Sequence, residues 1–368
     1  MLRVAFLGGS INSAIGRAHF TALSMDGNFK VVSGMFSRAR EVNLQTAATY
    51  GVKDVSAYNS IDHLISDSKN YDLIALLTPT PQHSQELKLL KKANLHVVSE
   101  KSLVHNVEES KIIGELYNEN ELSVIFNYTG YPMVREMRRR IKDAEIGDIQ
   151  QIQVEMPQEG FEKHDLSGKP IQPQTWRLVD GEIPTVALDL GVHLDSLIQF
   201  LTSEIPLSVF AVSNRYGNFE QIIDTQSALI KYSNGISVNF WISKAALGER
   251  NGIKIRIFGS KGSFQWVQER PDRIEFTNQF GVKRTIDRGD PSLKVAGKSR
   301  YMRFKPGHPT GFIEALANYY ADVSQKLNYL PNFEDEDGYV FSWKEAHQGI
   351  LLMNAIILSS RQGVQVKL

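Results

Sequence analysis

The sequence contains no cysteine among its 368 residues. This absence excludes disulfide bonds, thiolate nucleophiles and metal sites built on cysteine sulfur. It also lacks a net charge, because its 41 Lys and Arg residues equal its 41 Asp and Glu residues. No strong overall field therefore attracts nucleic acid or an anionic membrane surface, and we expect neither among the partners of this chain.

Long apolar runs are absent as well, since none approaches the roughly 18 residues of a membrane-spanning helix. The opening residues, MLRVAFLGG, lack the basic start and the small-residue cleavage site of a signal peptide. We therefore expect a cytoplasmic protein. Hydrophobic residues make up 42% of the chain and charged residues 22%, which is typical of a globular protein, and the length favours two domains.

The first third of the chain alternates short apolar runs with helical patterns. A helical pattern over residues 81–94 opens with Pro81, a residue that suits the first turn of a helix. The apolar runs predict buried strands at 4–8, 31–36, 73–78, 95–99 and 123–127. Strands alternating with helices predict a parallel, doubly wound sheet that binds a ligand at the carboxyl ends of its strands. We expect an α/β chain that begins with a Rossmann NAD(P)-binding domain over residues 1–128.

After about residue 148 the pattern changes to alternating polar and apolar residues, which is typical of strands with one face in water. Asn234-Gly235 between two such runs is a strong hairpin signal. Helical patterns over 310–326 and 342–361 close the chain. The alternating runs are 149–156, 207–213, 226–233, 236–243, 254–259 and 263–268. We expect residues 129–368 to form a C-terminal α+β domain with a large, mostly antiparallel open sheet.

A glycine-rich loop separates the first predicted strand from the first predicted helix. A dinucleotide pyrophosphate needs bare backbone and a helix amino-terminus at such a place. The strict G-x-G-x-x-G pattern fails, because Ser10 replaces its second glycine and about three extra residues precede Gly16. The setting between strand and helix still favours a dinucleotide over a plain turn. We expect the cofactor to contact Gly8, Gly9, Ser10, Ile15 and Gly16.

The second predicted strand ends at Ser37 and Arg38, where an NAD-binding chain usually carries an acidic residue for the ribose hydroxyls. A hydroxyl and a guanidinium suit the 2′-phosphate of NADP better than two free hydroxyls. Both residues are also ordinary at the solvated start of a helix. We expect NADP and leave NAD open.

Two more loops follow the central strands of the predicted sheet. Both lie where the crevice at the carboxyl ends of the strands is expected. A lysine there can polarise the oxygen of an alcohol as hydride leaves its carbon, although an isolated Glu-Lys pair is usually surface decoration. We count Thr78, Pro79, His83, Glu100 and Lys101 among the cofactor-binding residues.

Residues 187–201, ALDLGVHLDSLIQFL, place Asp189, His193 and Asp195 in an otherwise apolar segment. In a helix, Asp189 and His193 are four residues apart and project from one face. Three interpretations compete: half of a metal site, an acid/base pair lining a cleft, or a structural histidine. A catalytic metal needs at least three ligands, and no local pattern supplies a third, so we expect no metal. Asp195 is interpreted as a helix-surface or structural carboxylate.

Together these motifs resemble the glucose-fructose oxidoreductase, inositol dehydrogenase and rhizopine catabolism (Gfo/Idh/MocA) family, and the resemblance runs almost end to end. It rests on the glycine loop with Gly16 and His19, the TPTPQH turn, the Glu100-Lys101 pair and the DLGVH segment. FNYTGYPMVREM, TWR and PTGFIEALANYY also resemble one branch of that family. The resemblance implies a dehydrogenase with a Rossmann domain and a C-terminal α/β domain, acting on sugars, cyclitols or sugar derivatives.

The resemblance also implies roles for single residues. The family's lysine falls on Lys101, and its aspartate and histidine fall on Asp189 and His193. Three positions depart from the family pattern. Ser102 replaces the usual proline, Ser10 replaces a loop glycine, and Thr129-Gly130 stand where many members have an arginine, so substrate contacts are not transferred there.

Hydride transfer from a secondary alcohol also requires loss of the hydroxyl proton. Imidazole titrates near neutral pH, so we predict His193 as the general base. Lys101 would orient the hydroxyl and stabilise its negative charge, and Asp189 would bind a neighbouring hydroxyl and tune His193. We further count Tyr128, Trp176 and Arg177 among the substrate-binding residues, although burial explains the two aromatic rings equally well.

The alternatives differ in class. One is a sensor or regulator that binds the dinucleotide without turning anything over, and another is a metal-dependent hydrolase. The resemblance favours an enzyme with a small carbohydrate or cyclitol substrate. It also implies a homodimer or homotetramer held together through the open C-terminal sheet.

Overall fold

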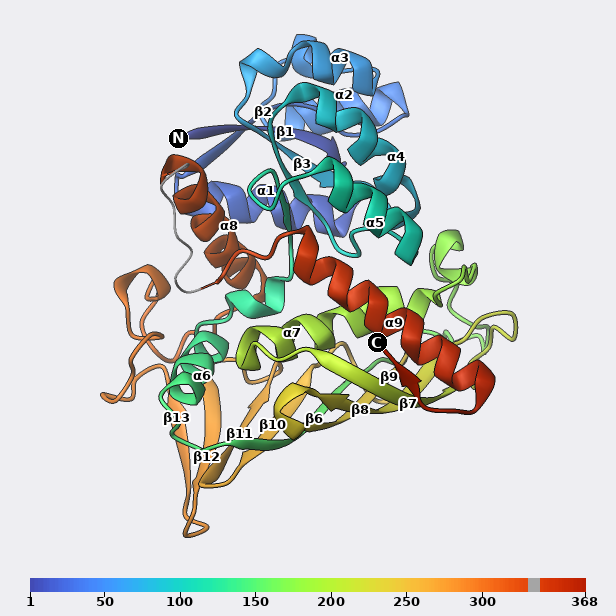
Figure 1. Ribbon diagram of the computed structural model, residues 1–368. Helices are drawn as coiled ribbons and strands as arrows, with labels where there is room; N and C mark the ends of the chain where they lie inside the picture. Colours follow the sequence, from blue (N-terminus) through green and yellow to red (C-terminus); the bar gives the residue numbers. More distant parts are fainter. Residues whose placement is uncertain (330–337) are drawn as a thin grey trace. The chain divides into compact units, whose positions relative to one another are not determined.

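The computed structural model describes residues 1–329 and 338–368 (Figure 1). The chain divides into two compact units. The first contains Met1–Gly130 and Gly311–His347, and the second contains Tyr131–Thr310 and Gln348–Leu368. Residues 311–329 and 338–347, which the sequence analysis assigns to the C-terminal domain, therefore return to the N-terminal unit.

A five-stranded sheet forms the centre of the first unit. Its strand order is β2-β1-β3-β4-β5, and every neighbouring pair is parallel. All five residues of β3 are buried, which explains why its sequence is continuously apolar. The predicted doubly wound parallel sheet is confirmed. The strands are β1 Leu2–Gly8, β2 Phe29–Met35, β3 Leu73–Leu77, β4 His96–Ser99 and β5 Leu122–Val124.

Helices surround this sheet, and one of them comes from the far end of the sequence. Helix α8, Phe312–Tyr329, packs beside α1, Ala14–Met25 (Figure 1). Its residues Leu316 and Tyr319 join Phe6 of β1 in the buried core of the first unit. These core contacts are the physical reason why α8 belongs to this unit. The other helices are α2 Arg40–Thr49, α3 Ile61–Ser66, α4 Thr80–Leu90 and α5 Val107–Leu116.

A nine-stranded sheet forms the second unit, in the order β13-β12-β11-β10-β6-β9-β8-β7-β14. The β6–β9 pair is parallel, and the other neighbouring pairs are antiparallel. All six predicted strands are present within one residue at either end. The strands are β6 Ile149–Pro157, β7 Pro206–Asn214, β8 Thr225–Tyr232, β9 Ser237–Ser243, β10 Lys254–Gly259, β11 Gly262–Val267, β12 Arg273–Asn278, β13 Lys283–Asp287 and β14 Val366–Lys367.

The predicted hairpin at Asn234-Gly235 is confirmed. Both residues have positive φ angles, 55° and 76°, and they connect the antiparallel strands β8 and β9. The predicted mostly antiparallel open sheet is also confirmed.

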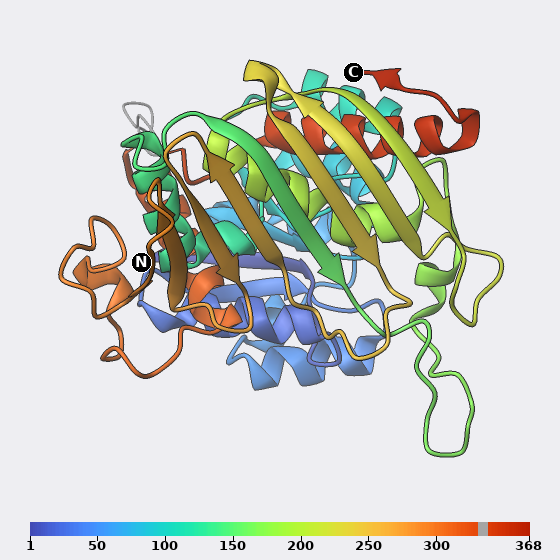
Figure 2. The same ribbon diagram turned by 90° about the horizontal axis from the view of Figure 1, so that it is seen from below.

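Helices cover one face of the nine-stranded sheet. Figure 2 views the sheet from its uncovered face, with α7 and the C-terminal part of α9 behind it. In β8 the residues alternate between buried and exposed, as expected for a sheet with only one face covered. The helices are α6 Pro132–Lys142, α7 Val192–Thr202 and α9 Trp343–Gln362, of which α9 begins in the first unit. Within the described residues, no helix combines the length and the apolar character needed to cross a membrane.

Candidate active site

The glycine loop of the first unit brings bare backbone to the amino-terminus of α1. Gly8 and Gly9 have φ angles of +84° and +74°, which favour glycine. A Cβ atom on Gly16 would lie 2.3 Å from the carbonyl oxygen of Gly9, so only glycine lets α1 pack this closely on the loop. Ser13 caps α1, because its hydroxyl accepts the Gly16 N–H at 3.2 Å. These features fit a dinucleotide pyrophosphate.

The structure gathers the predicted cofactor-side loops at one edge of the parallel sheet. Gly8 at the end of β1 is in register with Leu77 at the end of β3, and a Cβ atom on Gly8 would lie 2.8 Å from the Thr78 backbone nitrogen. The Glu100 N–H donates to the carbonyl oxygen of Leu76 at 2.9 Å. Ser10 and Ile15 are half-buried in the glycine loop and its helix. These loops therefore meet at the carboxyl ends of the strands, where the strand pattern predicts them.

The loop after β2 carries the predicted cofactor-selecting residues Ser37 and Arg38. The side-chain oxygen of Asn43 accepts the Ser37 N–H at 3.3 Å, which holds the loop against α2. Arg38 is exposed, and its Nη2 donates to Oε1 of Gln82 at 2.6 Å in the first turn of α4. The guanidinium of Arg38 is thereby directed from β2 toward the helix that follows β3.

His83 ties two of these loops together. It is buried, with Nε2 lying 2.7 Å from the Thr78 carbonyl oxygen and Nδ1 lying 2.9 Å from that of Ser102. Burial lowers the pKa of His83, although the surrounding carbonyls oppose that shift. The imidazole therefore fixes the turn containing Thr78 and Pro79 to the segment after Lys101. Direct cofactor binding by His83 stays a prediction.

Glu100 belongs to a buried chain of hydrogen bonds that the sequence analysis missed. Its Oε1 lies 2.8 Å from Nε2 of His19, and its Oε2 accepts the backbone N–H of Lys101 at 3.2 Å. On the other side of the ring, Nδ1 of His19 lies 2.6 Å from the hydroxyl of Tyr320. An ionised Glu100 fixes the tautomer in which Nε2 donates and the Tyr320 hydroxyl donates to Nδ1.

This chain links α8 and α1 to the peptide of Lys101. Burial raises the pKa of Tyr320 well above its usual value, which keeps the hydroxyl a donor. His19 stands beside the glycine loop in the sequence, but nothing in the local pattern around Tyr320 points to it. The partner of His19 lies 301 residues away.

The Asp189 and His193 segment of the second unit begins as a π-helix. Residues Ala187–Gly191 form this element, η6, and α7 continues directly from it. The predicted helix over 187–201 is present, with a wider first turn than expected, and such π segments are frequent at functional sites. The side chain of Asp189 is 13% exposed, and His193 is buried.

Asp189 is held by two cations. Nη1 of Arg177 and Nζ of Lys244 both donate to its Oδ2 oxygen. Arg177 lies in the short helix η5, Thr175–Leu178, and its guanidinium carbon lies 4.5 Å from the ring centroid of Trp176. The structure thus brings the predicted residues Trp176, Arg177 and Asp189 together.

Lys244 was missed by the sequence analysis. Lys244 directly follows the apolar strand β9. A lysine at the end of the run ISVNFWISK is the one local feature that could have drawn attention to it. The strand end alone does not identify its partner, because 55 residues separate Lys244 from Asp189.

Asp195 is a structural carboxylate, and the alternative of a helix-surface position is wrong. The residue is fully buried, and Tyr232 donates its hydroxyl to Oδ1 at 3.0 Å while Gln199 donates to Oδ2. Burial raises the pKa of Asp195 to about 6, although both hydrogen bonds oppose the shift.

Tyr128, a predicted substrate contact, lies in η4, Asn127–Gly130, which packs against α8 in the first unit. Its side chain is buried, so core packing accounts for the ring and substrate binding stays a prediction. Over residues 1–329 and 338–368, no three His, Asp or Glu side chains gather as a set of metal ligands.

Two family models match the chain. The oxidoreductase family with an NAD-binding Rossmann fold matches residues 2–128, and the Gfo/Idh/MocA C-terminal domain matches residues 134–265. Among individual proteins, the uncharacterized oxidoreductase YfiI of Bacillus subtilis is 27% identical over 348 residues, covering 91% of this chain and 88% of its own. Levoglucosan dehydrogenase of Pseudarthrobacter phenanthrenivorans is 23% identical over 328 residues, covering 80% of each chain.

The fold is also found among solved structures. An inositol dehydrogenase homolog of Azotobacter vinelandii, complexed with NADH and myo-inositol, superposes with a TM-score of 0.88 at 23% sequence identity. The superposition covers 100% of this chain and 97% of the other. At this level of identity the similarity shows a shared fold.

Proposed function

Because the chain belongs to the Gfo/Idh/MocA family of oxidoreductases, we propose that it transfers hydride between a nicotinamide dinucleotide and a secondary hydroxyl of a sugar, cyclitol or sugar derivative. The observation that carries this proposal is the position of His193 one turn after an aspartate that two cations already hold. Asp189 accepts charge-assisted hydrogen bonds from Arg177 and Lys244, which suits an anchor rather than a base. His193, one turn further on, then supplies the titratable group.

We assign the chemistry to three side chains of this protein. When bound, the nicotinamide accepts the hydride that leaves the substrate carbon. Lys101 binds the hydroxyl oxygen and stabilises the negative charge that develops on it. His193 takes the hydroxyl proton during oxidation and returns it during reduction. Asp189 accepts a hydrogen bond from a neighbouring substrate hydroxyl and orients His193.

The buried chain of hydrogen bonds that ends at the Lys101 N–H supports this assignment. Glu100, His19 and Tyr320 are buried, His19 is hydrogen-bonded to both of the others, and Glu100 accepts the Lys101 N–H. A network whose members are all satisfied rigidifies its surroundings, so it restricts the backbone from which the lysine side chain extends. Such pre-organisation matters because a catalytic ammonium must meet charge at a fixed point.

We propose NADP as the preferred cofactor. The loop Phe36–Ala39 contains no carboxylate to accept hydrogen bonds from two free ribose hydroxyls. It presents instead the Ser37 hydroxyl and the exposed guanidinium of Arg38, which donates in the geometry that phosphate accepts.

The experiment combines the protein and either NADP⁺ or NAD⁺ with a panel of sugars and cyclitols, and it follows the absorbance of the reduced nicotinamide. Turnover that falls on replacing Lys101 or His193 with alanine supports the proposal. Tight cofactor binding without turnover across the panel supports a dinucleotide-binding sensor instead. If both variants turn over the true substrate as fast as the wild type, the assigned roles are wrong.

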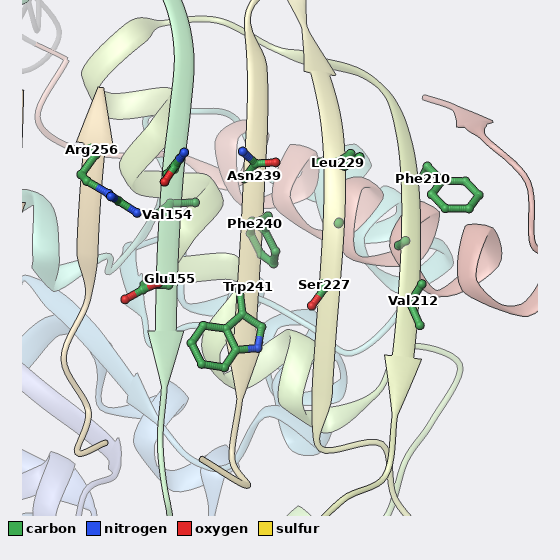
Figure 3. Close-up of a pocket in the computed structure, with 13 residues that line it drawn as sticks. Val154, Glu155, Phe210, Val212, Ser227, Leu229, Asn239, Phe240, Trp241 and Arg256 are labelled. Atoms are coloured by element: carbon green, nitrogen blue, oxygen red, sulfur yellow. The ribbon is translucent and has the colours of Figure 1, made fainter. Parts of the chain in front are cut away.

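We also propose that a second copy of the chain covers the open face of the nine-stranded sheet. Figure 3 shows Phe210, Val212 and Leu229 on this face, with Glu155 and Arg256 on strands further along. The three apolar side chains are 44%, 49% and 61% exposed. A two-fold contact brings the same patch of both copies together and removes these apolar side chains from water.

Light scattering tests this assembly. Leu229→Lys places a charge in the apolar part of the face and should convert dimers or tetramers to monomers. Leu166→Lys, the same substitution at an exposed leucine outside the sheet, serves as the control and should leave the mass unchanged. A wild-type protein that is monomeric at micromolar concentration overturns the proposed assembly.

A further inference from the structure

Lys244 is a buried cation with a fixed position in the second unit. Its side chain is 5% exposed and its Nζ donates to Oδ2 of Asp189. The ammonium lies 5.1 Å from the ring centroid of Phe161, and the Lys244 N–H donates to the Asp224 carbonyl oxygen at 2.8 Å. The strand end and the aromatic ring therefore hold the ammonium beside the predicted substrate-binding aspartate.

Arg177 brings a second cation to the same carboxylate oxygen and keeps part of its guanidinium available. Its Nε donates to Oε1 of Gln174 at 3.3 Å and its Nη1 donates to Asp189. Its Nη2 donates to no other residue in the described part of the chain, and 26% of the side chain is exposed. Stacking on Trp176 fixes the plane of the guanidinium, so the Nη2 edge has a defined direction.

The segment that carries Arg177 is anchored to the rest of the unit. Oδ1 of Asp180 accepts the Thr185 N–H at 2.9 Å, and Oδ2 of the same carboxylate accepts the Ile223 N–H at 2.8 Å. Leu178 packs against the small apolar cluster of Phe161, Phe219 and Ile222. Arg177 and Lys244 thus approach Asp189 from two fixed directions.

From this arrangement we infer that Arg177 and Lys244 select a substrate that carries a carboxylate, such as a sugar acid, over its neutral counterpart. Two cations share one carboxylate oxygen here, and the exposed edge of Arg177 can donate to a substrate carboxylate as well. With Nε and Nη1 engaged, Nη2 donates one charge-assisted hydrogen bond to that carboxylate, and charge attraction is strong where side chains are buried. The inference rests on the proposed function and narrows its substrate class.

Matched pairs of sugars test the inference by binding as well as by turnover. Calorimetric titration of the cofactor-loaded protein compares D-glucuronate with D-glucose and D-galacturonate with D-galactose. At least one acid should bind about 10- to 100-fold more tightly than its neutral partner, which is the range of a hydrogen bond to a charged group. Equal or weaker binding of both acids overturns the inference.

Variants locate the preference on the two cations. Lys244→Met and Arg177→Met should each remove most of the acid-over-neutral ratio, whereas Lys244→Arg should retain it. Lys231→Met removes an exposed lysine of β8 that donates to Ser237, and it should leave the ratio unchanged. An equal loss in Lys231→Met and Lys244→Met overturns the inference. If Lys244→Met does not fold, Arg177→Met and Lys244→Arg still decide the question.

Turnover of the same pairs separates this inference from the proposed function. Reduction of the nicotinamide by neutral sugars without any preference for acids leaves the proposed function standing and overturns the charge selection. Binding of an acid that depends on Lys244, without any reduced cofactor, supports the charge selection and counts against the proposed hydride transfer.

Discussion

Two aspartates six residues apart in one helical stretch have opposite surroundings. Asp189 lies in the π-helical turn and meets two cations, Arg177 and Lys244. Asp195 lies in α7, and its two donors in the part of the chain that the structure describes, Tyr232 and Gln199, are neutral. The comparison teaches that the partners of a buried carboxylate decide its effect, and its place in an amphipathic pattern does not. With cationic partners the carboxylate anchors a charged site, and with neutral partners its ionised form destabilises the fold.

The largest expected effect on catalysis comes from replacing His193, one turn after Asp189. His193→Ala should lower kcat by roughly 10²- to 10⁴-fold, because general base catalysis contributes about that much. Steady-state kinetics on a substrate found in the panel measures the loss. His164→Ala removes an exposed histidine of the same unit and should leave kcat unchanged. Equal rates for wild type and His193→Ala contradict the assigned base.

Asp189→Asn tests the anchor itself. The amide keeps the size of the carboxylate but removes the charge that both cations contact, so we expect kcat/KM to fall about 100-fold. We also expect a lower melting temperature, because two buried or half-buried cations lose their shared counter-charge. A variant with unchanged melting temperature would show that Asp189 does not hold these cations in solution.

Asp195→Asn should raise the stability of the folded protein at neutral pH, whereas Asp189→Asn should lower it. The folded pKa of Asp195, about 6, exceeds the unfolded value of 3.8, so the folded state keeps the proton to higher pH. This contribution is fully present below about pH 4, is lost as the pH rises from 4 to 6, and stays lost above that range. A shift of this size corresponds to about 3 kcal/mol for a fully buried group.

Thermal unfolding at pH 4 and pH 8 measures that difference. Asp195→Asn keeps an acceptor for Tyr232 and removes the buried charge, so the variant should gain stability relative to the wild type at pH 8 and lose this advantage at pH 4. Turnover should change little. A wild type whose stability relative to Asp195→Asn is the same at both pH values contradicts the titration of Asp195 in this window.

The comparison also shows which features of the fold and the site can be predicted from local sequence patterns. The alternation of strands and helices, the glycine loop and the Asp189–His193 spacing are features of short segments, and they predict the parallel sheet, the open sheet and the helix that carries both residues. Lys244 and Tyr320 contact their partners across 55 and 301 residues, and such contacts leave no periodic signal.

The return of α8 to the first unit was missed for the same reason. The helical periodicity of residues 310–326 predicts an apolar face but not the surface that the face covers. In the structure Leu316 and Tyr319 fill the core beside Phe6, far away in the sequence. Likewise, the pattern around Asp195 does not reveal whether the carboxylate points to water or to Tyr232.

The smallest expected effect belongs to Arg38, an exposed cation of the first unit. Unlike Arg177 and Lys244, Arg38 faces solvent, so screening weakens its attraction for a phosphate. Arg38→Ala should lower kcat/KM for NADP about tenfold, leave that for NAD unchanged, and have less effect as salt is added. Lys30→Ala, at the amino end of β2, is the matched control and should alter neither cofactor constant. Equal losses for both cofactors would mean that Arg38 supports the loop and does not bind a 2′-phosphate. Anion binding by cations of this chain would then be proposed only for Arg177 and Lys244, the two that contact Asp189.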